Sequence, residues 1–581
     1  MAHIRRIALL GLLLLALLAT TACVALPDTG PVVPAENEVR TRPQAEVERR
    51  AAPPQEGAPA QVVVTGFLQA MTAYPVRIEV ARQFLASNAR DAWIPSRKIV
   101  TYEGRGSVRG NDVVKVGIQG AHWVDDRGTW RGKRGSGEVE LKFPMIKEDN
   151  EWRIAKAPNA FIVTDDWFQD HYSPASIYYF DPTAGILVPE PVFVPDEQEA
   201  SALVQALLDG PGPQLDDVVT SFVPEGLKLG LSVPISDEGV ATIALEGDSG
   251  PLPPDAAALM IYQFAWTLRQ DPRITSFSIT IGDQPVTLDG STPLSIDLGS
   301  EYDPTDVAAS SLLFRLRNGL LESGDADSMS PVEGPLGRNR YGVSDVAVSL
   351  TAALASTVST DRTALQLTSV NDDRHPFKEV LSGATRLLRP SWDFADRLWL
   401  VDRRADGALV SMVDTVRDET AAVAVDVPGI TGKRVKDFIV SRDGTRLVAV
   451  VKGKRGDTLR VSRLRYGSQG GLVGATPSRN LTWGTDDAQR IRDIGWRSAT
   501  SVAVLNQLTP DYAQVVPVPV DGSTPSERRL AQQGRASAVV SSPVPDETLY
   551  LVTVDGLADP TGAEGQAKPL PTGVTSIQYA G

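Results

Sequence analysis

The chain has 581 residues, one cysteine and a formal net charge of −15 at pH 7. Because nucleic-acid binding depends on a basic surface, this balance argues against a nucleic-acid partner. One cysteine permits no intramolecular disulfide, and the length predicts several domains.

Residues 1–22 have the pattern of a bacterial signal peptide. Arg5 and Arg6 supply positive charge, and the apolar run 7–19 is shorter than the roughly 20 residues that span a bilayer. Small residues then precede Cys23. The segment resembles a lipobox, in which the cysteine thiol receives a diacylglycerol and becomes the new N-terminus. The resemblance predicts lipidation of Cys23 and anchoring to the extracytoplasmic face of the cell membrane.

Two alternatives follow from the same residues. Thr20 stands where a lipobox usually has leucine, and Thr20 and Ala22 also suit ordinary signal peptidase, which would release a freely secreted protein. Arg5-Arg6 could be a twin-arginine signal, although the flanking residues fit that pattern poorly.

Removal of 1–22 takes the net charge to −17. We therefore expect the lipid, and not the protein surface, to hold the chain to the membrane.

Residues 23–60 are expected to be the lipidated cysteine and a solvated tether. Residues 24–60 combine seven prolines with interleaved glutamates and have no aromatic residue. Such a composition cannot bury enough apolar surface to offset the entropy of ordering.

Residues 61–176 predict an α+β domain. Val63, Phe67 and Met71 recur at helical spacing, strand-like runs follow, and Glu148-Asp149-Asn150 predicts a hairpin turn. Helices followed by an antiparallel sheet resemble the NTF2-like fold.

Residues 177–300 predict a second α+β domain. A helix with one apolar face precedes Gly210, which we expect in the left-handed conformation that ends helices. Alternation of apolar residues from Leu227 to Val233 predicts a half-buried strand, and a second helix is expected over 255–269 before a final strand at 277–281.

This stretch resembles the GerMN domain of bacterial envelope proteins. The matching segments are Leu207–Pro211, Thr220–Gly226, Gly239–Ala241, Tyr262-Gln263 and Gly282–Val286. The resemblance implies a binding or assembly module without an active site.

Residues 310–581 carry a repeat in which a hydrophobic strand, a polar turn and a strongly apolar strand follow one another. Copies at Val346, Trp392, Phe438, Trp496 and Val540 lie about 45 residues apart, except for a longer step that contains Gly467–Asn480. This spacing predicts a β-propeller of five or six blades, and a β-sandwich is the alternative. Trp392, Trp399 and Trp496 are expected to pack between blades, and residues 323–340 to be a linker into the first blade.

The sequence offers little that points to catalysis. His3, His122, His171 and His375 lie far apart with no ligand spacing, and no nucleotide-binding loop or nucleophile elbow is present. Asp325-Ala326-Asp327-Ser328 begins like a calcium loop but lacks its later glycine and glutamate. The acidic pairs Asp165-Asp166 and Asp216-Asp217 are interpreted as solvated or helix-capping residues. We expect no catalytic, metal-binding or cofactor-binding residue.

The order of lipobox, tether, GerMN-like module and propeller resembles the lipoprotein LpqB family of actinobacteria. The resemblance implies a non-enzymatic accessory partner of the extracytoplasmic domain of the sensor histidine kinase MtrB, acting in cell-wall maintenance and division. The alternative from the residues alone is an envelope glycan-binding or glycan-active protein that uses the propeller channel; clustered acids and aromatics at the channel mouth would favour it.

Overall fold

The structure is a computed structural model and describes residues 51–73, 78–133, 137–248, 250, 252–306, 308–416, 421–484, 489–525, 527–562 and 567–581. Cys23, the signal peptide and most of the expected tether lie outside the described residues. The last tether residues differ from expectation. Ala58 is buried in the core of the first domain, and the Gly57 amide donates to the Glu151 carboxylate at 3.0 Å.

The N-terminal domain has helices α2 (Ala60–Met71), α3 (Ile78–Gln83), α4 (Ser87–Arg90) and α5 (Asp165–His171) around two four-stranded sheets. One sheet joins β1 (Lys98–Tyr102), β4 (His122–Asp125), β5 (Trp130–Lys133) and β8 (Phe161–Thr164). The other joins β2 (Gly104–Arg109), β3 (Val113–Gln119), β6 (Val139–Glu148) and β7 (Glu151–Ile154).

Local sequence explains much of this domain. Val63, Phe67 and Met71 are buried on one face of α2, as their spacing predicts. Asp149 and Asn150 both have positive φ and turn β6 into β7, which confirms the expected hairpin. The expected antiparallel sheet is wrong in one respect, because β1 pairs with β8 in parallel.

The middle domain begins with a long antiparallel hairpin, β9 (Tyr172–Phe180) and β10 (Leu187–Pro195). Helices α6 (Glu199–Leu208) and α7 (Pro254–Leu268) pack with a sheet of β11 (Lys228–Leu229), β12 (Val240–Glu246), β13 (Ser276–Ile281), β14 (Gln284–Val286) and β15 (Leu294–Ser295).

Two expectations for the middle domain have opposite outcomes. Gly210 has φ of 68° directly after the α6 C-cap, which confirms the left-handed helix end. The half-buried strand over 227–233 is wrong, because β11 has two residues and the Leu231 side chain is fully exposed. Pro234 follows this segment and has no N–H to donate to a neighbouring strand, so it does not favour a longer strand here.

The C-terminal domain is a propeller with six sheets in the described residues, which confirms the predicted fold. Blade 1 is β39 (Val574–Tyr579), β16 (Leu313–Arg317), β17 (Leu320–Gly324) and β18 (Met329–Pro331). Blade 2 is β19 (Val343–Val348), β20 (Leu354–Ser359), β21 (Leu365–Ser369) and β22 (Lys378–Leu381), and α8 (Pro335–Arg338) precedes it. Blade 3 is β23 (Ser391–Trp392), β24 (Arg397–Arg404), β25 (Gly407–Asp414) and β26 (Val423–Val425).

In the described residues blade 4 has five strands, blade 5 has four and blade 6 has three. Blade 4 is β27 (Val435–Val440), β28 (Arg446–Lys452), β29 (Asp457–Tyr466), β30 (Leu472–Ala475) and β31 (Arg479–Leu481). Blade 5 is β32 (Ile491–Ser498), β33 (Ser501–Thr509), β34 (Tyr512–Pro519) and β35 (Leu530–Gln533). Blade 6 is β36 (Ala536–Val540), β37 (Tyr550–Thr553) and β38 (Leu557–Ala558). The inner strands β39, β19, β23, β27, β32 and β36 contact one another in a closed ring.

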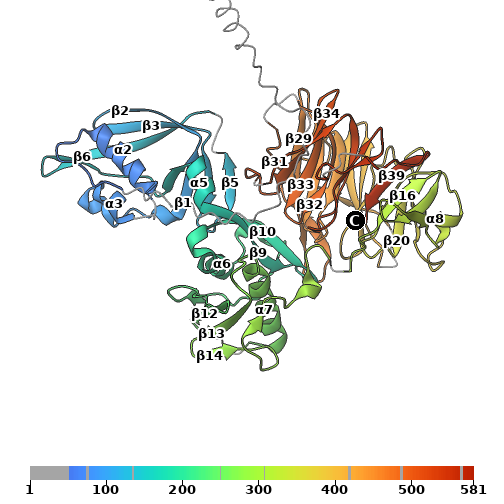
Figure 1. Cartoon of the computed structure of the whole chain (residues 1–581), viewed down its shortest axis with the longest axis horizontal. Coiled ribbons are helices and arrows are strands. Elements are labelled where there is room, and N and C mark those ends of the chain that lie inside the picture. Colours follow the sequence, from blue (N-terminus) through green and yellow to red (C-terminus); the bar gives the residue numbers. More distant parts are fainter. Residues whose placement is uncertain are drawn as a thin grey trace, which may run out of the picture. The chain divides into compact units, whose positions relative to one another are not determined.

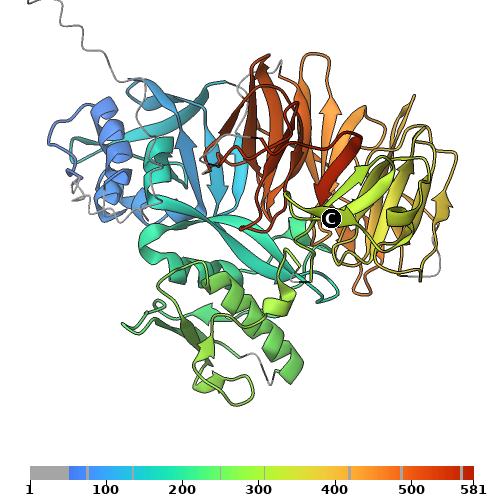
Figure 2. The same ribbon diagram turned by 45° about the vertical axis from the view of Figure 1, so that its right-hand side comes forward.

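The ring is closed by both ends of the domain. The C-terminal β39 pairs with β16 and supplies the inner strand of blade 1, and Figures 1 and 2 show the two strands side by side. The expected linker over 323–340 is therefore wrong, because β17 and β18 of blade 1 overlap it.

Candidate functional site

The β9–β10 hairpin connects the three domains and is the first candidate site (Figure 1). On one side, the Phe193 amide donates to the Gly128 carbonyl at 2.8 Å, and the Phe193 ring lies 5.1 Å from that of Phe168 in the N-terminal domain. On the other side, the Glu190 carboxylate lies 3.1 Å from Arg446 and 2.5 Å from Arg463 of blade 4.

The Glu190 cluster is buried and charged. The Arg446 side chain has no exposed surface, and it also pairs with Asp443 at 3.1 Å and donates to the Pro189 carbonyl. Burial, together with the adjacent Arg446 charge, lowers the pKa of Arg463 to about 10. Removing one partner from such a cluster leaves an uncompensated charge, so the cluster holds the middle domain in one position on the propeller.

The expected insertion at Gly467–Asn480 makes a further contact between these domains. The hairpin formed by the end of β29 and β30 projects from blade 4, and the Tyr466 amide donates to the Asp217 carbonyl at 2.7 Å. A Cβ atom placed on Gly470 would lie 3.1 Å from Cγ2 of Thr183 in the β9–β10 turn.

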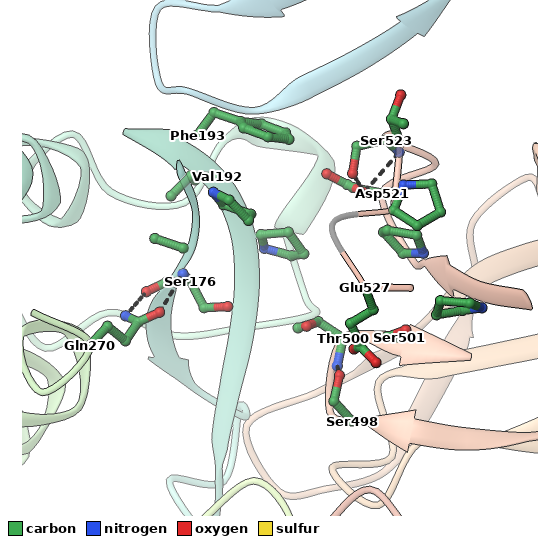
Figure 3. A pocket seen from close by; sticks show the side chains of 17 residues that line it. Ser176, Val192, Phe193, Gln270, Ser498, Thr500, Ser501, Asp521, Ser523 and Glu527 are labelled. Carbon is green, nitrogen blue, oxygen red and sulfur yellow. Dashed lines mark hydrogen bonds between the residues drawn. The ribbon is translucent and has the colours of Figure 1, made fainter. Parts of the chain in front are cut away.

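A small pocket of about 200 Å³ lies between the β9–β10 hairpin and blade 5 (Figure 3). Its lining is rich in hydroxyl groups and prolines and includes two carboxylates, Asp521 and Glu527. The Ser501 hydroxyl is buried and has no hydrogen-bond partner among the described residues. The lining contains no histidine, lysine or cysteine, so the pocket suits hydrogen bonding to a polar group more than covalent catalysis.

The propeller channel holds a second polar cluster. Arg389 precedes the inner strand of blade 3, and Asp345, Asp437 and Asp493 lie near the starts of three other inner strands. Burial opposes the charged form of Arg389, but the three carboxylates outweigh it and raise its pKa. Burial and the adjacent Asp437 raise the pKa of Asp493 well above its usual value.

The structure places the residues noted in the sequence mainly in packing roles. His122 stacks on Trp130 and His171 on Trp167, with ring centroids 5.0 and 4.3 Å apart. His375 lies 3.3 Å from the Ser369 hydroxyl. No group of three or more candidate metal ligands occurs within the part of the chain that the structure describes.

The acidic motifs belong to local turns and helix ends. Asp165 and Asp166 form the first turn of α5, where acids favour the helix dipole. Asp217 has positive φ in a turn. The calcium-like loop at Asp325 is the turn between β17 and β18, and Asp327 pairs with Lys568 at 2.6 Å.

The three tryptophans are buried, as expected, but they are not equivalent. The indoles of Trp392 and Trp496 lie on inner strands and donate to carbonyls of the preceding blade, Ala347 and Val440. Trp399 lies on the second strand of blade 3 and donates to Asp393 in its own blade, at 3.0 Å.

The sequence reasoning missed the Glu190 cluster and the Arg389 group. Neither has a local signature, because Glu190 meets Arg446 and Arg463 from more than 250 positions away. The repeat itself was the only available signal for the channel residues, since Asp345, Asp437 and Asp493 each follow a bulge at the same position of an inner strand.

Family comparisons agree with this architecture. Models described as "Lipoprotein LpqB, N-terminal domain", "Sporulation and spore germination" and "Lipoprotein LpqB beta-propeller domain" match residues 53–169, 176–287 and 319–567. The fold therefore defines a multidomain protein that carries a GerMN domain and a C-terminal propeller.

Curated relatives extend the match along most of the chain. Lipoprotein LpqB of Thermobifida fusca is 28% identical over 540 residues, which cover 83% of this chain and 84% of the relative. The proteins of the same name from Cutibacterium acnes and Streptomyces coelicolor are each 26% identical; they cover 90% and 87% of this chain, and 90% and 86% of their own lengths. The chain belongs to the lipoprotein LpqB family.

Proposed function

We propose that this protein is a non-enzymatic accessory lipoprotein, anchored through Cys23 on the extracytoplasmic face of the membrane, that binds the extracytoplasmic domain of a sensor histidine kinase of the MtrB type. Family membership supports the lipoprotein character. In the described residues no helix is long and apolar enough to cross a membrane. The proposal takes Cys23, the single cysteine of the sequence, as the attachment point.

The observation that carries the binding role is the docking of the propeller on the middle domain by the Glu190 cluster. A propeller fixed in this way presents several blades and the GerMN-like module as one preorganised surface, which lowers the entropic cost of binding a partner. Preferential binding to one state of the kinase ectodomain would shift its equilibrium. Confinement of both proteins to one membrane raises their effective concentration, so a weak interface suffices.

The test is a membrane pull-down from cells that express the native chain, Cys23→Ala, or the neighbouring control Thr21→Ala. We expect the native chain and the control to sediment with membranes and to recover the kinase, as identified by mass spectrometry. After a high-salt wash, which screens purely electrostatic attachment, Cys23→Ala should appear in the soluble fraction without the kinase. Absence of any sensor kinase from the native pull-down would refute the partner.

A second candidate, glycan binding in the propeller channel, is favoured by the carboxylates of Asp345, Asp437 and Asp493 near the channel mouth. Two facts count against glycan binding. The three carboxylates interact with Arg389, and the side chains of Trp392, Trp399 and Trp496 are buried, so they are not free to stack on a sugar. Recovery of peptidoglycan fragments in place of a kinase, lost in Asp437→Asn, would establish this second function.

A further inference from the structure

The two faces of the propeller differ in what covers them. The turns that follow the inner strands face the middle domain, because Arg446, just after such a turn, meets Glu190, and Arg442 donates to the Thr305 carbonyl. The opposite face, where the inner strands begin, carries the connections between blades and the turns between second and third strands. We call it the entry face.

The entry face of blades 2 to 5 is basic. The segments 360–364, 382–389, 402–406, 433–437, 452–457 and 489–493 contain thirteen lysines and arginines against six aspartates, in a chain of net charge −15. Asp345 in the channel, Asp426 in the connection before blade 4 and Asp511 in the turn of blade 5 add three acids, and Asp486 and Asp487, outside the described residues, add two. Thirteen basic residues therefore stand against eleven acidic ones, which leaves a small positive excess on a chain that is acidic as a whole. We call these six segments the basic ridge.

Backbone hydrogen bonds make the ridge continuous. The Arg403 amide donates to the Arg386 carbonyl at 3.1 Å, and the Lys452 amide to the Arg434 carbonyl at 2.8 Å. Arg490 joins the next blade through Asp457 at 2.9 Å. The charges therefore lie along one surface.

Like charges are crowded within the ridge. Arg403 is half-buried, its Nε has no hydrogen-bond partner among the described residues, and burial followed by the charges of Arg386 and Arg362 lowers its pKa. Arg386, Arg434 and the turn residues Lys454 and Arg455 are exposed, and they have no carboxylate within 4.0 Å among the described residues. Such crowding is unfavourable in isolation and is relieved by an anionic partner.

The same face carries exposed apolar side chains on blades 5 and 6. Leu508 and Tyr512 flank the turn between β33 and β34, and Val554 lies in the turn after β37; their exposed fractions are 48%, 50% and 84%. We call these three residues the apolar tips. Basic side chains beside protruding apolar and aromatic ones match the charge and the interface of an anionic bilayer.

We propose that the entry face is a membrane-docking surface, on which the basic ridge binds anionic phospholipid headgroups and the apolar tips enter the interface. This goes beyond the proposed kinase contact and does not depend on it. It differs from the expectation that the lipid, and not the protein surface, holds the chain to the membrane, because that expectation uses the net charge of the whole chain and not the charge of one face.

The test is vesicle co-sedimentation of the chain from position 23 onward with Cys23→Ala, so that no lipid anchor contributes. We expect binding at low salt to vesicles that contain 30% phosphatidylglycerol and little binding to pure phosphatidylcholine. Each basic side chain near an anionic surface contributes about a fivefold change in partitioning. The variant Arg434→Gln/Lys454→Gln/Arg455→Gln should therefore have a vesicle partition coefficient about a hundredfold lower than that of the parent.

The matched control is Arg105→Gln/Lys115→Gln/Lys142→Gln, which neutralises three exposed basic residues of the N-terminal domain and should bind like the parent. Lys452→Arg/Lys454→Arg keeps the charge and should also bind. Leu508→Ala/Tyr512→Ala should weaken the binding that remains at high salt. The proposal would be overturned if the chain bound equally to both vesicle types, or if the ridge and control variants lost vesicle binding equally. It would also be overturned if the chain bound an acidic kinase ectodomain but no vesicles.

Discussion

Individual charged residues decide much of the energetics of this propeller. In the channel, Asp493 accepts from the Val539 amide at 2.8 Å, so its carboxyl bonds blade 5 to blade 6. Its raised pKa means that the folded state favours the protonated carboxyl more than the unfolded state does. The stability linked to that proton is present at low pH and is lost as pH rises through the folded-state pKa.

We therefore expect Asp493→Asn to raise the thermal unfolding midpoint at neutral pH, because an amide keeps the bond to Val539 without a buried charge. The gain should shrink as pH falls toward the usual pKa of aspartate, about 4. Calorimetric scans from pH 4.5 to 8 measure the difference in unfolding midpoint between the variant and the native chain, and Asp511→Asn, at an exposed position, is the control. A destabilised variant at neutral pH would mean that Arg389 needs this carboxylate ionised.

At the scale of elements, the closing strand β39 is the critical one. It pairs with β16 and contacts β19 and β36, so it bonds the first blade to both neighbours. Ending the chain at residue 573 would expose β16 as an unpaired edge, which promotes aggregation. We expect the truncated chain to lose its cooperative propeller unfolding transition and to aggregate in size-exclusion chromatography.

Tyr579→Phe is the control for that truncation. It removes the hydroxyl that donates to the Thr548 carbonyl at 2.9 Å, and should cost about 1 kcal/mol while the chain stays monodisperse. A soluble, cooperatively unfolding truncation would show that blade 1 is stable without its inner strand.

Elements with a local cause could be predicted from the sequence, and elements with a distant cause could not. The Asp149-Asn150 turn and the Gly210 helix end depend on backbone preferences of the residues themselves. Blade 1 was missed because its inner strand comes from the other end of the domain, which breaks the repeat at 313–331. The Glu190 cluster was missed for the same reason, since only the docked domains bring its members together.

At the scale of the whole molecule, the middle domain and propeller should move as one body. Domains within a chain ordinarily move relative to each other unless the interface is strong. Here the Glu190 cluster, the bond from Tyr466 to Asp217 and the bond from Arg442 to Thr305 act at separate places. The chain offers a clean test of this docking, because Cys23 is its only cysteine.

In a Cys23→Ala background, Thr183→Cys/Gly470→Cys should form a disulfide under mild oxidation. A Cβ on Gly470 lies 3.1 Å from Cγ2 of Thr183, which is about where the sulfur of a cysteine at 183 would stand. Thr183→Cys/Gly534→Cys should not crosslink, since a Cβ on Gly534 meets nothing within 4 Å. Non-reducing electrophoresis after trypsin digestion measures the yield. Adding Glu190→Gln should slow crosslinking severalfold, because Arg463 then loses its carboxylate partner and Arg446 keeps only Asp443, which favours separation of the domains. Equal rates with and without Glu190 would assign the docking to the two remaining contacts, the β29–β30 hairpin and the bond from Arg442 to Thr305.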